Sequence, residues 1–183
     1  IFSTASMSIH IGTSGWIYNH WEHVLYPPGT PPYHRLGYYL EHFQTVELNA
    51  SYYRWPRDTT FKSWRRRLPE GFLMSVKAPR GLTHAKKLYG PERWLSTIQK
   101  CWHALLEKRG ILLVQLSPLF EYDYDRLAYF LKQLPWWMRT TVEFRHPSWH
   151  REEVFQLLEQ YQVAYCIMSG AYLPCILRTT APF

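Results

Sequence analysis

The chain has 183 residues, a length that suits one domain with a sizeable hydrophobic core. Lysine and arginine outnumber aspartate and glutamate by 21 to 14, and the resulting formal net charge of +7 favours anionic partners. The three cysteines have no metal-binding or redox spacing and argue against a secreted disulfide framework, and no apolar run approaches the ~20 residues of a membrane span.

Strand-like and helix-like segments alternate along the sequence. Short apolar segments predict six strands, at Ser8–Gly12, Val46–Ser51, Phe72–Ala78, Ile111–Leu116, Thr141–Arg145 and Val163–Met168. Apolar residues at helical spacing predict a helix between each pair of neighbouring strands, on stripes that begin at Leu36, Phe61, Trp94, Leu127 and Val154. Asp58 and Asp123 can cap two of these helices at their N-termini, and Pro69 and Pro135 can end them.

Strict alternation of strands with helices predicts parallel strands joined by right-handed crossovers. An open doubly wound sheet and a (β/α) barrel both satisfy this pattern. The loop Gly12–Trp16 lacks a glycine-rich phosphate fingerprint and leads into a long aromatic segment, so no nucleotide-cofactor motif is present. Polar residues recur on one face of successive strands near their C-terminal ends, which is typical of a barrel with its site at that end.

The predicted fold is therefore α/β, a TIM-barrel-like (β/α) barrel that is truncated after strand six. Closing such a barrel takes eight strands in about 250 residues. We expect residues 7–183 to form a single, incomplete barrel domain, with open edges at strands one and six. Residues 1–6 are expected to be an N-terminal extension without signal-peptide character, and the protein is expected to be cytoplasmic.

Two strand segments, Thr45–Ala50 and Thr141–His146, alternate apolar with charged or amide residues. Side chains in a strand point to opposite faces with a period of two, so Glu47 lies on the face of Asn49, and Glu143 on the face of Arg145. The same alternation on the neighbouring strands predicts a cluster on the inner face near the strand C-termini. Its expected members are Glu47, Asn49, Lys77, Gln115, Glu143 and Arg145.

This cluster can do acid–base chemistry. Glu47 and Glu143 can act as general acid and base, or as ligands for a hard divalent cation, so the metal is unknown. Asn49 and Gln115 would supply neutral oxygens or orient a substrate. Lys77 and Arg145 suit an anionic group of a substrate, but they could equally pair with the two glutamates in a closed network inside the barrel.

Three further residues are candidates at the mouth of the barrel. His146 follows a strand end and could be a third catalytic residue or a cap of the next helix. Tyr52 and Trp16 lie in segments that follow strands, where their rings could stack on a sugar or a base. Ordinary packing of loops against the barrel is the alternative for both aromatic residues.

Several motifs together resemble the YecE-like family, a bacterial and archaeal domain of unknown function. The resemblance spans Ile9 to Phe183 and rests on Gly12–Trp16, Tyr26–Pro27, Thr45–Asn49, Tyr52–Pro56, Phe72–Lys77, Thr83–His84, Gln115–Pro118, Glu143–Trp149 and Thr180–Phe183. It implies a TIM-barrel-like fold and brings no established reaction. After strand six many relatives carry an acidic residue, whereas this chain has Ile167–Ser169 there.

The leading functional hypothesis is an enzyme that acts on an anionic or polyhydroxylated small molecule, by hydrolysis, lyase chemistry or isomerisation. Glu47, Glu143 and His146 would be catalytic, and Asn49, Lys77, Gln115, Arg145, Tyr52 and Trp16 would bind substrate. The alternative is a nucleic-acid-binding module that uses the basic surface and exposed aromatic residues. A barrel that serves protein interaction alone is a third hypothesis, and none of the three involves a membrane.

Overall fold

Six parallel strands form one sheet in which the order of the strands, β1 to β6, is their order in the chain. The structure is a computed structural model that describes residues 9–170 and 173–183. The strands are β1 (Gly12–Ser14), β2 (Thr45–Leu48), β3 (Leu73–Lys77), β4 (Arg109–Gln115), β5 (Thr140–Glu143) and β6 (Ala164–Tyr165). The predicted extension, residues 1–6, lies outside the described residues, as does Ser8 of the first predicted strand.

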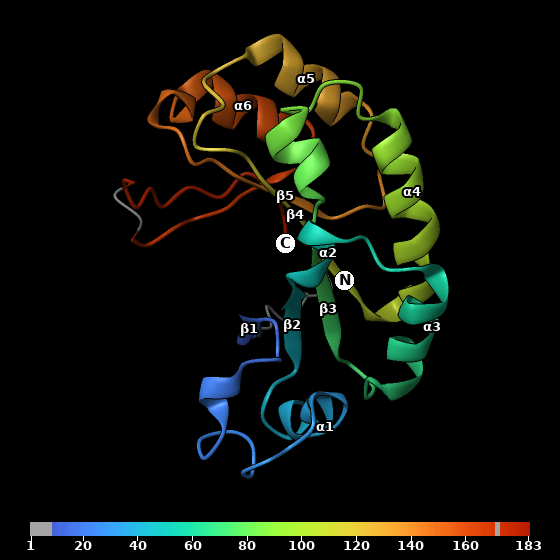
Figure 1. The fold of residues 1–183 in the computed structure, drawn as a ribbon. Helices are drawn as coiled ribbons and strands as arrows, with labels where there is room; N and C mark the ends of the chain where they lie inside the picture. The colour runs from blue at the N-terminus through green and yellow to red at the C-terminus, as the bar shows by residue number, and fades with distance from the viewer. Residues whose placement is uncertain (1–8, 171–172) are drawn as a thin grey trace, which may run out of the picture.

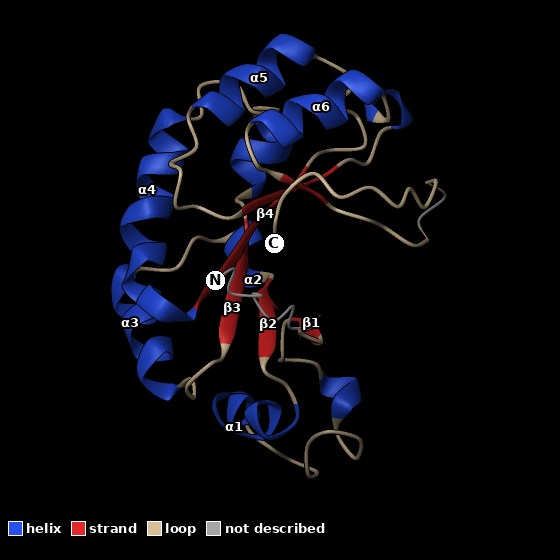
Figure 2. Ribbon diagram, turned by 180° about the vertical axis from the view of Figure 1, so that it is seen from behind, coloured by secondary structure: helices blue, strands red, loops and turns tan. Residues whose placement is uncertain are grey.

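Helices surround the curved sheet (Figure 1). They are α1 (Pro32–His42), α2 (Ala50–Tyr53), α3 (Asp58–Arg67), α4 (Glu92–Trp102), α5 (Tyr124–Lys132) and α6 (Glu152–Gln160). Seen from behind, α3, α4, α5 and α6 follow one another in an arc around the strands, and α1 lies beyond the lower ends of β2 and β3 (Figure 2). The predicted α/β, TIM-barrel-like architecture is confirmed, and the sheet of the described residues is open between β1 and β6.

The hydrophobic core lies between the sheet and these helices. Alternate strand residues such as Val46, Met74, Val76 and Val142 are fully buried on the outer face. They pack in one cluster with Phe61 and other apolar residues of the helices. Because side chains alternate along a strand, the polar residues between them face the inside of the curve.

Three predicted strands differ clearly from the structure. The second, predicted as Val46–Ser51, ends at Leu48, because Ala50–Tyr53 form α2. The first strand is Gly12–Ser14 rather than Ser8–Gly12, because β2 begins at Thr45 and its register places Thr45 opposite Gly12. Residues before Gly12 therefore have no strand beside them, and Ile9 and Ile11 are exposed. The sixth strand keeps only Ala164–Tyr165 of its predicted length.

One of the two predicted helix caps is confirmed. The carboxylate of Asp123 accepts a hydrogen bond from the backbone N–H of Arg126 at 3.1 Å and begins α5. The prediction for Asp58 is wrong by one residue, because Arg57 is the N-cap of α3. Asp58 lies in the first turn instead, where its carboxylate pairs with Lys62 at 3.1 Å. The positive end of the helix dipole also stabilises a negative charge at this position.

The C-terminal segment contacts the edge of β6. The hydroxyl of Thr180 accepts a hydrogen bond from the backbone N–H of Tyr165 at 2.7 Å and donates one to the carbonyl of Val163 at 2.6 Å. The Thr180 side chain thus satisfies backbone groups that a neighbouring strand would otherwise satisfy. Within the residues that the structure describes, no helix has the length and apolar character to cross a membrane.

Candidate functional site

An open pocket with a volume of about 330 Å³ lies on the inner face of the sheet. Strands β1 to β5 and Cys166, just after β6, line it, and both Glu47 and Glu143 contribute to its walls. The predicted alternation of these two strands is therefore confirmed. The strand register also determines the neighbours of each carboxylate. Glu47 lies beside Ser14 and Ser75, and Glu143 lies beside Gln115.

Glu143 is the buried, paired carboxylate of this pocket. Only 6% of the residue is exposed, and its Oε1 atom accepts a hydrogen bond from Nε2 of Gln115 at 2.8 Å. The same oxygen forms an ion pair with Nε of Arg145, two residues further along the chain. A buried charge needs such partners, so Gln115 and Arg145 hold Glu143 as a fixed carboxylate.

Glu47 has a different environment. Its Oε1 atom accepts a hydrogen bond from the hydroxyl of Ser14 at 3.0 Å, and the part of the chain that the structure describes gives it no ion pair within salt-bridge distance. Burial raises the pKa of Glu47 above its ordinary value, an effect that the Ser14 hydrogen bond and the charge of Lys77 oppose and that of Glu143 reinforces. Two carboxylates in one pocket whose environments differ in this way can take different roles.

Positive charges gather at the rim of the pocket, beyond the end of β3. Nζ of Lys77 lies 5.2 Å from the centre of the Tyr52 ring, and the edge of that ring contacts His84 with 5.2 Å between the ring centres. Burial lowers the pKa of His84, and the positive charges of Arg80, Lys77 and Arg145 lower it further. Charged side chains from β3, from the turn that follows it and from the segment after β5 therefore all lower the pKa of His84.

Of the nine predicted site residues, only Glu47 and Glu143 line the pocket itself. Gln115 and Arg145 contact Glu143, and Lys77 lies against Tyr52 beyond the end of β3.

The other three predicted site residues have different environments. Trp16 is 7% exposed and packs edge-on against Trp64 of α3, with 6.0 Å between ring centres, so its ring belongs to the core. His146 caps the 3₁₀ turn Pro147–Trp149, where its side chain accepts from the backbone N–H of Ser148. It does not cap α6, whose N-cap is Arg151. Asn49 is the N-cap residue of α2 and makes no side-chain capping hydrogen bond there.

Sequence reasoning missed Ser14, Arg80 and Cys166. Alternation along the actual first strand, Gly12–Ser14, places Ser14 beside Glu47. The predicted strand, Ser8–Gly12, ended before Ser14. Cys166 continues the alternation of Ala164 and lines the pocket. Arg80 precedes a π-helical turn, Gly81–Ala85, and a conformation of this kind has no simple sequence pattern.

Metal ligands were one alternative for the two glutamates. Over residues 9–170 and 173–183, no group of three or more histidine, cysteine, aspartate or glutamate side chains is placed to hold a metal ion.

Comparisons with known proteins identify relatives over most of the chain. A family described as "Protein of unknown function DUF72" matches residues 10–183. The chain is 30% identical over 150 residues to the UPF0759 protein YunF of Bacillus subtilis, covering 77% of this chain and 52% of that protein. It is 26% identical over 146 residues to the UPF0759 protein YecE of Escherichia coli K12, covering 76% of this chain and 49% of that protein. The chain thus spans about half the length of these relatives.

Solved structures have the same fold. A DUF72 family protein from Thermotoga maritima superposes with a TM-score of 0.80 at 28% identity, over 94% of this chain and 70% of that chain. A DUF72 family protein from Enterococcus faecalis superposes with a TM-score of 0.68 at 20% identity, over 94% of this chain and 69% of that chain. The second comparison concerns the fold alone.

Proposed function

This chain belongs to the DUF72 family, as its resemblance to YecE-like proteins predicted, and on that premise we propose that its inner pocket catalyses proton transfer on a small anionic molecule. The observation that supports the proposal is the difference between the two carboxylates of the pocket. Glu143 is paired with Arg145 and Gln115, whereas Glu47 has a neutral hydroxyl partner and a raised pKa. A carboxyl group whose pKa is raised by burial suits general acid–base catalysis.

Each side chain has a role in this proposal. Glu47 gives and takes the proton, with Ser14 orienting its carboxylate through the 3.0 Å hydrogen bond. Glu143 keeps Arg145 and Gln115 in place on the adjacent wall. Lys77 at the rim neutralises negative charge on the substrate. Hydrolysis, elimination and isomerisation all use such proton transfers, so the reaction class stays open among these three. We assign no proton transfer to His146, because its ring nitrogen is engaged in the turn after β5.

Turnover of small anionic metabolites by the Glu47→Gln variant tests this function. Loss of general acid–base catalysis typically lowers the rate about 10²–10⁴-fold, and we expect a loss of this size with little change in the melting temperature. Glu41→Gln is the matched control, since Glu41 is exposed on α1, away from the pocket. Equal turnover by the parent protein and Glu47→Gln would overturn the proposal.

A nucleic-acid-binding module is the second candidate, supported by one surface groove. This groove between α3 and α4 has a volume of about 520 Å³, and its lining includes Lys62, Arg65, Arg66, Lys100 and His103. Two of these cations are already paired, Lys62 with Asp58 and Arg65 with Glu107. Affinity for single-stranded or duplex DNA that falls steeply with added salt, and falls again in Arg66→Met, would favour this candidate.

A further inference from the structure

The rim of the pocket carries cations that lack acidic partners. Among the residues that the structure describes, neither Lys77 nor Arg80 forms an ion pair with a carboxylate. Lys77 is half-buried at the end of β3, and Arg80 is exposed three residues later. Like charges that lie close together repel one another, and a bound anion removes that repulsion.

The segment that holds these residues is rigidly supported. The hydroxyl of Ser51 lies 2.6 Å from the carbonyl oxygen of Lys77 and 2.7 Å from that of Leu48, which fixes the start of α2 against the end of β3. Gly81, the first residue of the π-helical turn, lies against Trp94 of α4 so closely that an added Cβ would be 2.3 Å from the ring. Neither side of the rim can therefore move freely, and a ligand would meet preorganised groups.

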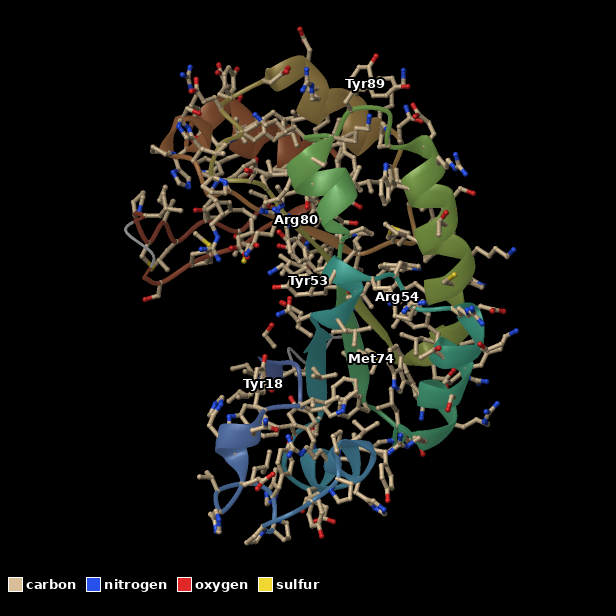
Figure 3. All side chains as sticks on the ribbon, in the orientation of Figure 1. Tyr18, Tyr53, Arg54, Met74, Arg80 and Tyr89 are labelled. Carbon is tan, nitrogen blue, oxygen red and sulfur yellow. The ribbon has the colours of Figure 1, made fainter. Side chains whose placement is uncertain are left out.

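Figure 3 shows the two segments that frame the rim, with Tyr53 labelled on α2 and Arg80 labelled at the start of the turn after β3. Tyr53 is 77% exposed, whereas its neighbour Tyr52 is half-buried and its ring contacts both Lys77 and His84. The ring of Tyr52 thus forms one wall of the rim.

Hydrogen bonds determine which nitrogen of His84 is available. The hydroxyl of Thr83 lies 3.3 Å from the carbonyl oxygen of Pro79 and 3.0 Å from Nδ1 of His84. Nδ1 is therefore the ring nitrogen engaged within the turn, and a protonated His84 has N–H donors on both ring nitrogens. The charged and titratable groups that act on this ring are Lys77, Arg80, Arg145 and Tyr52.

We infer that Lys77, Arg80 and His84 form a subsite for the anionic group of the substrate, a phosphate or a carboxylate, with the Tyr52 ring as its wall. This inference rests on the proposed function, since it places the charged end of the substrate at the rim and the reacting carbon near Glu47. Arg80 offers a planar fork of donors and Lys77 a point charge. His84 completes the subsite by taking up a proton as the anion enters, so binding and proton uptake are coupled.

Direct binding measurements test the subsite without any need for turnover. Inorganic phosphate and acetate, titrated separately by calorimetry, distinguish a phosphate subsite from a carboxylate subsite. We expect Lys77→Met and Arg80→Met each to lower the affinity for the preferred anion at least about tenfold, because each removes a charge-assisted hydrogen bond. Lys132→Met, which removes an exposed charge at the end of α5, should leave the affinity unchanged. Equal weakening by Lys132→Met, or no saturable binding of either anion, would overturn the inference.

The pH dependence tests the histidine. Between about pH 8 and pH 6 the affinity should rise as His84 becomes easier to protonate, and calorimetry in two buffers of different ionisation enthalpy should show proton uptake. In His84→Gln the binding of acetate, which does not titrate in this range, should have a flat pH profile without that uptake, and the binding of phosphate should keep only the dependence that comes from its own ionisation. Uptake on acetate binding that persists in His84→Gln would remove His84 from the subsite.

The outcomes separate this inference from the proposed function. Glu47→Gln should still bind the anion saturably, because Glu47 lines the pocket and does not belong to the subsite. Saturable anion binding through Lys77 and Arg80 without turnover of any tested metabolite would support the subsite and count against acid–base catalysis. Turnover with the same KM in the parent protein and in Arg80→Met would support acid–base catalysis and count against the subsite.

Discussion

Arg145 donates from Nε to Oε1 of Glu143, two residues earlier on the same face of the chain, and so pairs a buried carboxylate with a partly exposed guanidinium. Side-chain exposure is 33% for Arg145 and 8% for Glu143. The pair is therefore asymmetric, because water can solvate one partner if the other is removed but not the reverse. This arrangement lies between an open catalytic site and a sealed network.

The asymmetry predicts unequal effects of removing each partner. Arg145→Met leaves the buried Glu143 charge with Gln115 alone and should lower the free energy of unfolding by about 3 kcal/mol. Glu143→Gln leaves a cation that reaches water and should cost only about 1–2 kcal/mol. Urea unfolding of both variants and of the double variant measures the difference. Equal losses, or a larger loss in Glu143→Gln, would contradict the asymmetry.

The raised pKa of Glu47 predicts how stability changes with pH. Between the ordinary value of 4.5 and the higher pKa of the folded state, the native protein binds more protons than the unfolded chain. Stability therefore falls as pH rises through this window, and the fall should be smaller in Glu47→Gln. Urea unfolding of both proteins at several values between about pH 4 and pH 7 gives the two profiles. Parallel profiles would show that Glu47 titrates normally.

The thiol of Cys166 should be unreactive. Burial raises its pKa from 9.0 to about 11, with Glu143 and Glu47 reinforcing the shift and Arg145 and Lys77 opposing it. Since the thiolate is the nucleophile, alkylation of Cys166 by iodoacetamide should be much slower than alkylation of the exposed Cys175. Peptide mass spectrometry on native and denatured protein measures both rates, and denaturation should make them similar. Rapid labelling of Cys166 in native protein would mean that the pocket is more open than described.

Gly110 marks a close approach between two strands. A Cβ at this position would lie 2.5 Å from the hydroxyl oxygen of Ser75, which accepts a hydrogen bond from the backbone N–H of Ile111. Gly110→Ala should therefore cost about 1–3 kcal/mol through overpacking. Gly37→Ala is the opposite case, because Gly37 lies within α1 with open space around it and alanine should stabilise the helix by about 0.5–1 kcal/mol. Melting temperatures that shift in the same direction would contradict this pair of expectations.

The sequence predicted the parallel α/β fold because alternation within strands and stripes within helices are local patterns. Glu47 and Glu143 were placed correctly for this reason, since a period of two determines the face on which each residue lies. The same rule did not locate the first strand, whose bounds depend on where β2 begins and hence on pairing between distant residues. Pairing of this kind leaves no local signal.

Residues outside regular elements were harder to place. Trp16 and Tyr52 both follow strands in aromatic segments, yet one ring is buried against Trp64 and the other forms part of the rim. Packing between distant elements decides this, and neither residue's neighbours in the sequence reveal it. The sequence did not place His84 among the site residues, because the side chains that surround it come from α2, β3 and the segment after β5.

The sheet follows the order of the chain, and this has a consequence for how the protein assembles. Each strand pairs with the one synthesised just before it, so βα units can dock in succession without waiting for distant partners. Within the described residues, β1 and β6 are three and two residues long and each pairs with one strand. Backbone amides of these two short strands should therefore exchange with solvent faster than those of β3 and β4.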